Sequence, residues 1–218
     1  MIFESFCFLL AESGGNYFYC FFYKFADRYK IRQKERRMSI QIRPIKPEDY
    51  EQVLAVARTL ASWFNPLDQM ALVIDLPRHE GLVATEEAEV LGFVTYHLFR
   101  PQVAELSWFG VLPTQQGRGI GRQLLVALET TLAWRGVRTL ELSTVPADHD
   151  KVFAATNSFY KRHGFTIHKW DNNYYAYGRP RILLKKEIAK SAIQARGKNP
   201  QKHAHIPVKE PKSVNSKQ

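Results

Sequence analysis

Glycines and arginines gather in one short stretch that carries the clearest chemical signal in the sequence. The stretch reads Gln116-Gly117-Arg118-Gly119-Ile120-Gly121-Arg122 and lies between a strand-like and a helix-like segment. Glycines in such a turn let successive backbone N–H groups point into one concavity, with the positive end of a helix behind them. The two arginines add positive charge. The stretch therefore predicts a cradle for an anion such as a phosphate or a pyrophosphate.

Three interpretations of this glycine-rich turn compete. A P-loop would need Gly-Lys followed by Ser or Thr, and Arg122 is followed by Gln123, so that motif is absent. A dinucleotide-binding fingerprint would need a third glycine where Leu124 stands, although Glu141 falls where its acidic residue is expected. A turn without any ligand is the remaining alternative. The glycines alone leave the last two interpretations open.

Hydrophobic periodicity and turn residues predict the elements that must position this turn. Apolar residues at Leu124, Leu125, Leu128 and Leu132 follow helical spacing, and Gly136 ends that helix. We expect further helices at 47–60, 66–74 and 157–163, and strands at 40–44, 82–85, 90–99, 104–111, 138–144, 165–175 and 181–187. This order predicts an α/β (α+β) fold, in which one mixed sheet has helices on both faces.

A second block of residues, taken with the glycine-rich turn, gives the chain a family resemblance. The block is Asn157-Ser158-Phe159-Tyr160-Lys161-Arg162-His163-Gly164-Phe165. Together with Gln116–Gly121, it resembles the signature blocks of the GNAT family of N-acetyltransferases, which use acetyl-CoA. The resemblance covers about residues 40–187. It implies the GNAT-like acyl-CoA N-acyltransferase fold, with a single mixed, mostly antiparallel central sheet flanked by helices.

The resemblance also implies how acetyl-CoA, the expected co-substrate, would be held. Backbone N–H groups of the glycine-rich turn would bind the pyrophosphate, and the pantetheine arm would lie between splayed strands at 104–111 and 138–144. The thioester carbonyl would meet backbone N–H groups around Phe109–Val111. The implied cofactor-binding residues are Phe109, Gly110, Val111, Gln116, Gly117, Arg118, Gly119, Ile120, Gly121, Arg122 and Asn157. No metal is expected.

Acyl transfer to an amine needs a base, because an alkyl amine with a pKa of about 10 is mostly protonated at neutral pH. By its offset before Gln116, Glu105 resembles the catalytic glutamate of the histone-acetylating branch of the family, whereas many other members place the base elsewhere. The alternative is a strand-end carboxylate paired with a basic neighbour. Tyr160 matches the tyrosine that serves the leaving thiolate, and the alternative is a core tyrosine. We interpret His163 as a capping or surface residue.

Four aromatic residues are candidates for the acceptor pocket, because they fall where the family places its acceptor loops. They are Trp63, Phe64, Tyr174 and Tyr175. Packing in the core would explain the same residues.

The net charge of +10 sits mainly at the two ends of the chain. Residues 1–38 and 187–218 together carry +8 and the middle carries +2, which argues against a broad basic face for nucleic acid. We expect an aromatic and basic extension outside the fold at 1–38, with Met38 as an alternative start. A GNAT acetyltransferase domain would follow at 39–187 and a basic flexible tail at 188–218, whose His203 and His205 would be solvated.

The sequence therefore predicts an N-acetyltransferase that moves an acetyl group from acetyl-CoA to a primary amine by direct attack in a ternary complex. The acceptor would be a small-molecule or peptide amine of open identity, and no nucleic acid is expected. The alternative is a catalytically silent CoA-binding or regulatory module with the same fold. Without an apolar run of membrane-spanning length or a signal peptide, we expect a cytoplasmic protein. A homodimer remains open.

Overall fold

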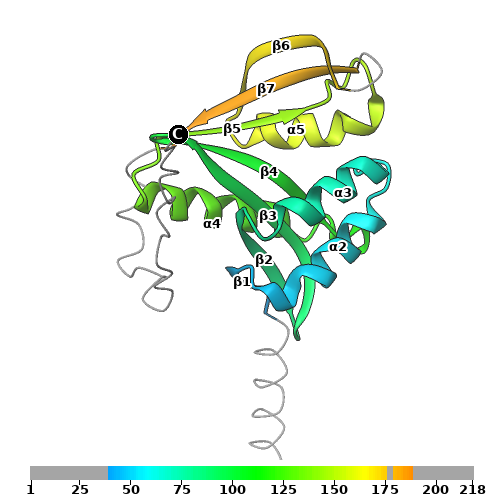
Figure 1. Cartoon of the computed structure of the whole chain (residues 1–218), viewed down its shortest axis with the longest axis vertical. Helices are drawn as coiled ribbons and strands as arrows, with labels where there is room; N and C mark the ends of the chain where they lie inside the picture. Colours follow the sequence, from blue (N-terminus) through cyan, green and yellow to red (C-terminus); the bar gives the residue numbers. More distant parts are fainter. Residues whose placement is uncertain (1–38, 176–178, 189–218) are drawn as a thin grey trace, which may run out of the picture. The chain divides into compact units, whose positions relative to one another are not determined.

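The computed structural model describes residues 39–175 and 179–188 of the 218-residue chain. The expected extension at 1–38 and all but the first residue of the expected tail lie outside these residues, as do His203 and His205. Figure 1 shows strands β1 (Gln41–Pro44), β2 (Glu80–Glu86), β3 (Glu89–Arg100), β4 (Val103–Val111), β5 (Thr139–Thr144), β6 (Thr166–Tyr175) and β7 (Arg179–Glu187). The helices are α2 (Tyr50–Thr59), α3 (Pro66–Asp75), α4 (Ile120–Trp134) and α5 (Ala154–Arg162), with 3-10 turns η1 (Pro47–Asp49), η2 (Pro113–Gln115) and η3 (Lys151–Phe153).

The described strands form a seven-stranded sheet in the order β1-β2-β3-β4-β5-β7-β6. Strands β4 and β5 are parallel, whereas β1–β2, β5–β7 and β6–β7 are antiparallel. The prediction of a mixed, mostly antiparallel sheet flanked by helices is confirmed. None of the described helices has the length and apolar character needed to cross a membrane.

Two predicted helices differ from the structure in where they begin. The helix expected at 47–60 is divided, because the Asp49 carboxylate accepts a hydrogen bond from the Lys46 N–H and closes a separate turn, η1, before α2. The helix expected at 157–163 starts earlier, at Ala154, after η3. There the Asp150 carboxylate accepts from the Val152 N–H, so a capping residue that the prediction overlooked begins the helical run.

The chain divides into two compact units. The first takes in the described residues up to Thr95 together with Trp108–Leu124, and the second takes in Tyr96–Ser107 together with the described residues from Leu125 to Ile188. Strands β3 and β4 and helix α4 therefore contribute to both units.

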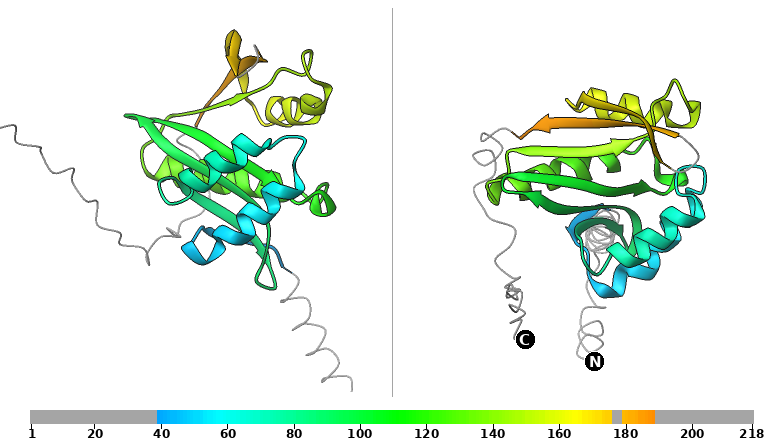
Figure 2. Two further views of the ribbon diagram at one scale, coloured as in Figure 1. Left: turned by 45° about the vertical axis from the view of Figure 1, so that its right-hand side comes forward. Right: turned by 45° about the horizontal axis from the view of Figure 1, so that its top comes forward.

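In the first unit, α2 and α3 cover the face formed by β2 and the first half of β3 (Figures 1 and 2). Apolar residues of α2 repeat with helical spacing and form one buried core with residues of α3, β2 and β3. Its fully buried members include Val53, Ala57, Leu72, Val83 and Phe93. The packing is close: a Cβ added to Gly110 of β4 would lie 2.9 Å from Leu60 Cδ1 and 3.0 Å from Phe93 Cε1. Glycine at this position therefore lets α2 approach the sheet.

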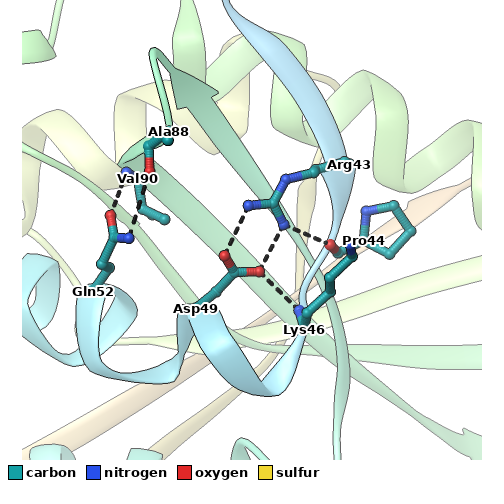
Figure 3. Close-up of polar contacts among 7 residues, drawn as sticks. All are labelled: Arg43, Pro44, Lys46, Asp49, Gln52, Ala88 and Val90. Atoms are coloured by element: carbon teal, nitrogen blue, oxygen red, sulfur yellow. Dashed lines mark hydrogen bonds and ion pairs between the residues drawn. The ribbon is translucent and has the colours of Figure 1, made fainter.

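A two-pronged ion pair fixes the junction between β1 and α2 (Figure 3). Arg43 donates from Nη1 to Asp49 Oδ2 at 2.6 Å and from Nη2 to Oδ1 at 2.7 Å. The Lys46 N–H donates to the same carboxylate at 2.8 Å, and Asp49 is only 4% exposed. Because the guanidinium stabilises the charged carboxylate, it holds the pKa of Asp49 below its usual value.

In the second unit, the parallel pairing of β4 with β5 is short. It runs from Val103 opposite Thr139 to Leu106 opposite Leu142, although β4 itself continues to Val111. On its other side β5 pairs with β7 along its whole length. The backbone of the last described residue, Ile188, donates to the Arg138 carbonyl at 2.7 Å, so the ordered pairing extends one residue past the expected domain end.

Acid should destabilise the protein partly through Asp49. Its lowered pKa means that the ion pair stabilises the fold above the ordinary aspartate pKa and loses this effect as the pH falls through the folded-state value, below about pH 4. Asp49→Asn should lower the free energy of unfolding at pH 7 by about 2 kcal/mol and should flatten its decline in acid. Denaturant unfolding between neutral and acid pH measures both effects. Glu51→Gln, on the exposed side of α2, is the control, and an unchanged acid profile in Asp49→Asn would contradict this role for the pair.

Candidate active site

The glycine-rich turn joins η2, which follows β4, to the start of α4. Gly117 and Gly119 have φ angles of 80° and 77°, in the left-handed region that L side chains rarely adopt. A Cβ at either position would meet nothing within 4 Å, so the backbone conformation and not a lack of space requires glycine. Gln116 folds the turn back onto the strand, because its Nε2 donates to the Val111 carbonyl at 3.1 Å.

The first turn of α4 supplies backbone N–H groups and partial positive charge. The Gln123 N–H donates to the Gly119 carbonyl at 3.0 Å, which is the first hydrogen bond of the helical ladder. The backbone N–H groups just before Gln123 therefore do not take part in that ladder. Gly119 has no side chain to cap the helix, and no acidic residue lies in its first turn. Ile120 is 1% exposed and anchors the helix start in the core. This arrangement can accept an anion.

The side chain of Arg118 is engaged with an acidic residue. Its Nη2 lies 2.9 Å from Glu86 Oε1 and its Nη1 lies 3.2 Å from Glu86 Oε2, and Nη1 also donates to Gln115 Oε1. The pair lowers the pKa of Glu86 and raises the pKa of Arg118. The sequence predicted positive charge from both arginines, whereas Glu86 balances the charge of Arg118 in the structure. Nothing in the spacing of the two residues could have revealed this partner.

The end of β4 is fixed in the first unit by contacts on both sides of Phe109. Trp108 Nε1 donates to Asp75 Oδ2 of α3 at 2.9 Å, and the Leu112 N–H donates to the Leu91 carbonyl at 2.9 Å. Gly110 is buried, while Phe109 and Val111 are half-buried. The three residues expected near the thioester therefore lie on a firmly held strand.

In the second unit, Glu105 lies beside a histidine. His97 Nε2 is 3.8 Å from Glu105 Oε2, and His97 Nδ1 is 3.1 Å from Ser107 Oγ. The side chains of His97 and Glu105 are 35% and 33% exposed. Sequence reasoning did not single out His97 or Ser107. Ser107 could have been found, because residues two apart on a strand share a face, but nothing in the sequence links His97 to Glu105.

Helix α5 carries the other two predicted site residues. Asn157 accepts from the Ala147 N–H at 3.1 Å and donates to the Val145 carbonyl at 3.0 Å, so it ties α5 to the loop after β5. Tyr160 is 5% exposed and packs edge-on against Phe159 and Phe165. Burial raises the pKa of its phenol far above the usual value, so the hydroxyl stays protonated.

The remaining predicted residues divide between surface and core. His163 is confirmed as a capping residue, since it is the C-cap of α5 and its Nδ1 lies 2.8 Å from the Phe159 carbonyl oxygen. Phe64 is a core residue that packs against Phe93 and Trp108, and Trp63 is half-buried beside it. Tyr174 is exposed, with the guanidinium of Arg181 3.3 Å from its ring centre. Tyr175 is the last residue of β6.

The predicted site residues divide over the two units. Phe109, Gly110, Val111 and Gln116 to Arg122 belong to the first, and Glu105, Asn157 and Tyr160 belong to the second. Among the residues that the structure describes, no cluster of His, Cys, Asp or Glu could hold a metal ion.

Comparison with known sequences identifies the same region. Residues 77–167, which include both sequence blocks, match the family model "Acetyltransferase (GNAT) domain". A mycothiol acetyltransferase from Kytococcus sedentarius is 36% identical over 109 residues, which are 50% of this chain and 32% of that protein. The chain thus matches about a third of the length of this curated relative.

Solved structures share the fold. The ribosomal-protein-S18-alanine N-acetyltransferase from Escherichia coli matches with a TM-score of 0.59 at 23% identity, over 69% of this chain and 95% of that chain. The PaiA N-acetyltransferase from Thermoplasma acidophilum, solved in complex with coenzyme A, matches with a TM-score of 0.53 at 20% identity, over 69% and 99%. The family match, the sequence blocks and the fold agree, and residues 77–167 of the chain carry a GNAT acetyltransferase domain.

Proposed function

We propose that the protein transfers an acetyl group from acetyl-CoA to a primary amine by direct attack in a ternary complex. One observation carries the proposal: the left-handed turn at Gly117 and Gly119 leads into an α4 N-terminus without acidic residues, inside the segment that matches the GNAT domain. That combination is suited to a pyrophosphate.

Backbone groups would supply most of the contacts to acetyl-CoA. Backbone N–H groups from Gln116 to Gly121 would hold the pyrophosphate, with the charge of Arg122 nearby. The part of β4 beyond its pairing with β5 would receive the pantetheine arm as an added strand, with the thioester carbonyl at Phe109–Val111. We assign Asn157 a CoA contact alongside its hydrogen bonds to the loop after β5.

The acid–base roles follow from the environments of Glu105 and Tyr160. Acetyl-CoA supplies the acetyl group as a thioester. Glu105 would take the proton from the attacking amine, and its partial exposure lets that proton pass on to water or to His97. The Tyr160 phenol is a weaker acid than a thiol, whose pKa is about 8.5. Tyr160 would therefore stabilise the departing thiolate by donating a hydrogen bond, without giving up its proton.

The acceptor is an amine on a small molecule or a peptide. The relatives differ in this respect, since one is named for mycothiol and another for an alanine of a ribosomal protein. We further propose that residues 39–187 form the acetyltransferase domain and that the protein acts in the cytoplasm. The alternative function is a silent module that binds CoA without turnover.

Release of free CoA tests the proposal directly. The full chain is incubated with acetyl-CoA and a panel consisting of spermidine, free amino acids, a lysine-containing peptide and a peptide with N-terminal alanine. We expect CoA release above the rate without acceptor for at least one amine. Calorimetric binding of CoA without release by any amine would favour the silent module, and absence of CoA binding would exclude both functions.

Substitution of a turn glycine should weaken CoA binding. Gly119→Ala places a side chain at a φ of 77°, which costs about 1–2 kcal/mol. If binding must restore the native turn, a cost of that size weakens the affinity for CoA about tenfold. Gly136→Ala is the matched control, because Gly136 also has a φ of 77° with nothing within 4 Å of an added Cβ. It should lose comparable stability and keep its CoA affinity. Equal affinities in the two variants would contradict the role of the turn.

Loss of the Tyr160 hydroxyl should slow turnover and spare binding. We expect Tyr160→Phe to lower kcat by about tenfold to a hundredfold, with little change in CoA affinity, because the hydrogen bond serves only the departing thiolate. Tyr96→Phe is the control, since Tyr96 is another buried tyrosine of the second unit. Wild-type turnover in Tyr160→Phe would rule out this assignment.

A further inference from the structure

We propose that Glu86 and Arg118 act as a positioning pair: Glu86 holds the guanidinium of Arg118, so that the backbone of the glycine-rich turn binds the anion. Arg118 then acts through the shape of the turn and not as a direct ligand of a phosphate. This inference rests on the proposed binding of CoA at that turn.

The geometry of the pair suits an anchor. Both guanidinium Nη atoms reach the Glu86 carboxylate, at 2.9 and 3.2 Å, and Gln115 accepts a further hydrogen bond from the same group. A two-pronged contact of this kind fixes the orientation of the guanidinium as well as its distance from the carboxylate. Arg118 stands between Gly117 and Gly119, the two left-handed residues, so its side chain restrains the peptide units on both sides. The glycines themselves have no side chains that could do this.

Glu86 is presented by a hairpin that is itself held in place. It is the last residue of β2, whose neighbouring Thr85 pairs with Gln41 of β1. The hairpin turn uses Glu87 and Ala88 at φ angles of 49° and 73°, a conformation that costs free energy for residues other than glycine.

Helix α2 holds this turn through one glutamine (Figure 3). Gln52 Oε1 accepts from the Val90 N–H at 2.9 Å, and Gln52 Nε2 donates to the Ala88 carbonyl at 3.5 Å. The carboxylate of Glu86 therefore projects from a braced part of the first unit, and the ion pair can transmit that support to the glycine-rich turn.

The pair also determines which charge remains for an anion. Glu86 and Arg118 neutralise each other, with side chains 19% and 41% exposed. Arg122 is exposed, and within the described part of the chain its guanidinium has no hydrogen bond or ion pair. Long-range attraction for CoA should therefore come from Arg122 and the α4 N-terminus.

Two models of Arg118 predict opposite effects of neutralising Glu86. If Arg118 is a positioning residue, Glu86→Gln loosens the turn and weakens CoA binding, as Arg118→Gln does. If Arg118 is a direct phosphate ligand, Glu86→Gln frees its guanidinium, removes a nearby negative charge and tightens CoA binding. The sign of one change in affinity therefore separates the models.

The experiment is a double-mutant cycle on the full chain, with CoA affinity measured by calorimetry at low and high salt. We expect Glu86→Gln and Arg118→Gln each to weaken binding about two- to fivefold, the range of an exposed ion pair, and the double variant to bind no worse than either. Arg122→Gln is the control: its effect should add to that of Glu86→Gln, and it should reduce the salt dependence. Tighter binding by Glu86→Gln would overturn the inference.

Charge exchange distinguishes positioning from a general loss of stability. Glu86→Arg combined with Arg118→Glu should recover affinity relative to Arg118→Glu alone, and thermal unfolding without CoA shows whether each variant folds. If the wild-type protein binds CoA and Glu86→Gln binds it equally well, the inference fails while the proposed function stands. If the wild-type protein does not bind CoA, both fail.

Discussion

The sharpest constraint on the structure is the reversal of the chain between β4 and α4. It needs left-handed backbone at Gly117 and Gly119, with open space where side chains would lie. With the turn in this conformation, α4 begins at the buried Ile120, and the backbone N–H groups of its first turn do not take part in the helical hydrogen-bond ladder. The anion binding that we propose for the turn would thus follow from how the chain is connected, and the packed end of β4 holds the turn in place.

Two arginines of the first unit are paired with carboxylates. Arg43 is matched by Asp49 at the entry to α2, and Arg118 is matched by Glu86 beside the glycine-rich turn. The net charge of +10 therefore says little about the ligand, since +8 belongs to the ends of the chain and the paired arginines leave little unbalanced charge near the turn. What remains is local: the α4 N-terminus and Arg122. A local field of this kind suits a compact pyrophosphate better than an extended polyanion.

Much of the fold could be predicted from the sequence, because the spacing of apolar residues along the chain follows the period of the helix or strand that contains them. The leucines of α4 and the glycine that ends it are examples, and the predicted strands agree with the observed ones within a few residues. The missed features depend on side chains that meet only in three dimensions. Glu86 meets Arg118 and His97 meets Glu105 across separate strands and turns, and no spacing rule connects such partners. The early start of α5 was different, since Asp150 carried a readable capping signal.

The environments of Glu105 and Tyr160 suit different parts of one reaction. A base must return its proton to the surroundings in every cycle, and Glu105 is a third exposed with a histidine close by. A phenol that stabilises a thiolate must remain protonated throughout, and burial against Phe159 and Phe165 favours that state of Tyr160. Exchanging the two environments would harm both roles, because a buried carboxylate would resist ionisation and an exposed phenol would exchange its hydrogen bond with water. The contrast in burial is thus an argument, separate from the sequence blocks, for the roles that we propose for Glu105 as the base and Tyr160 as the hydrogen-bond donor.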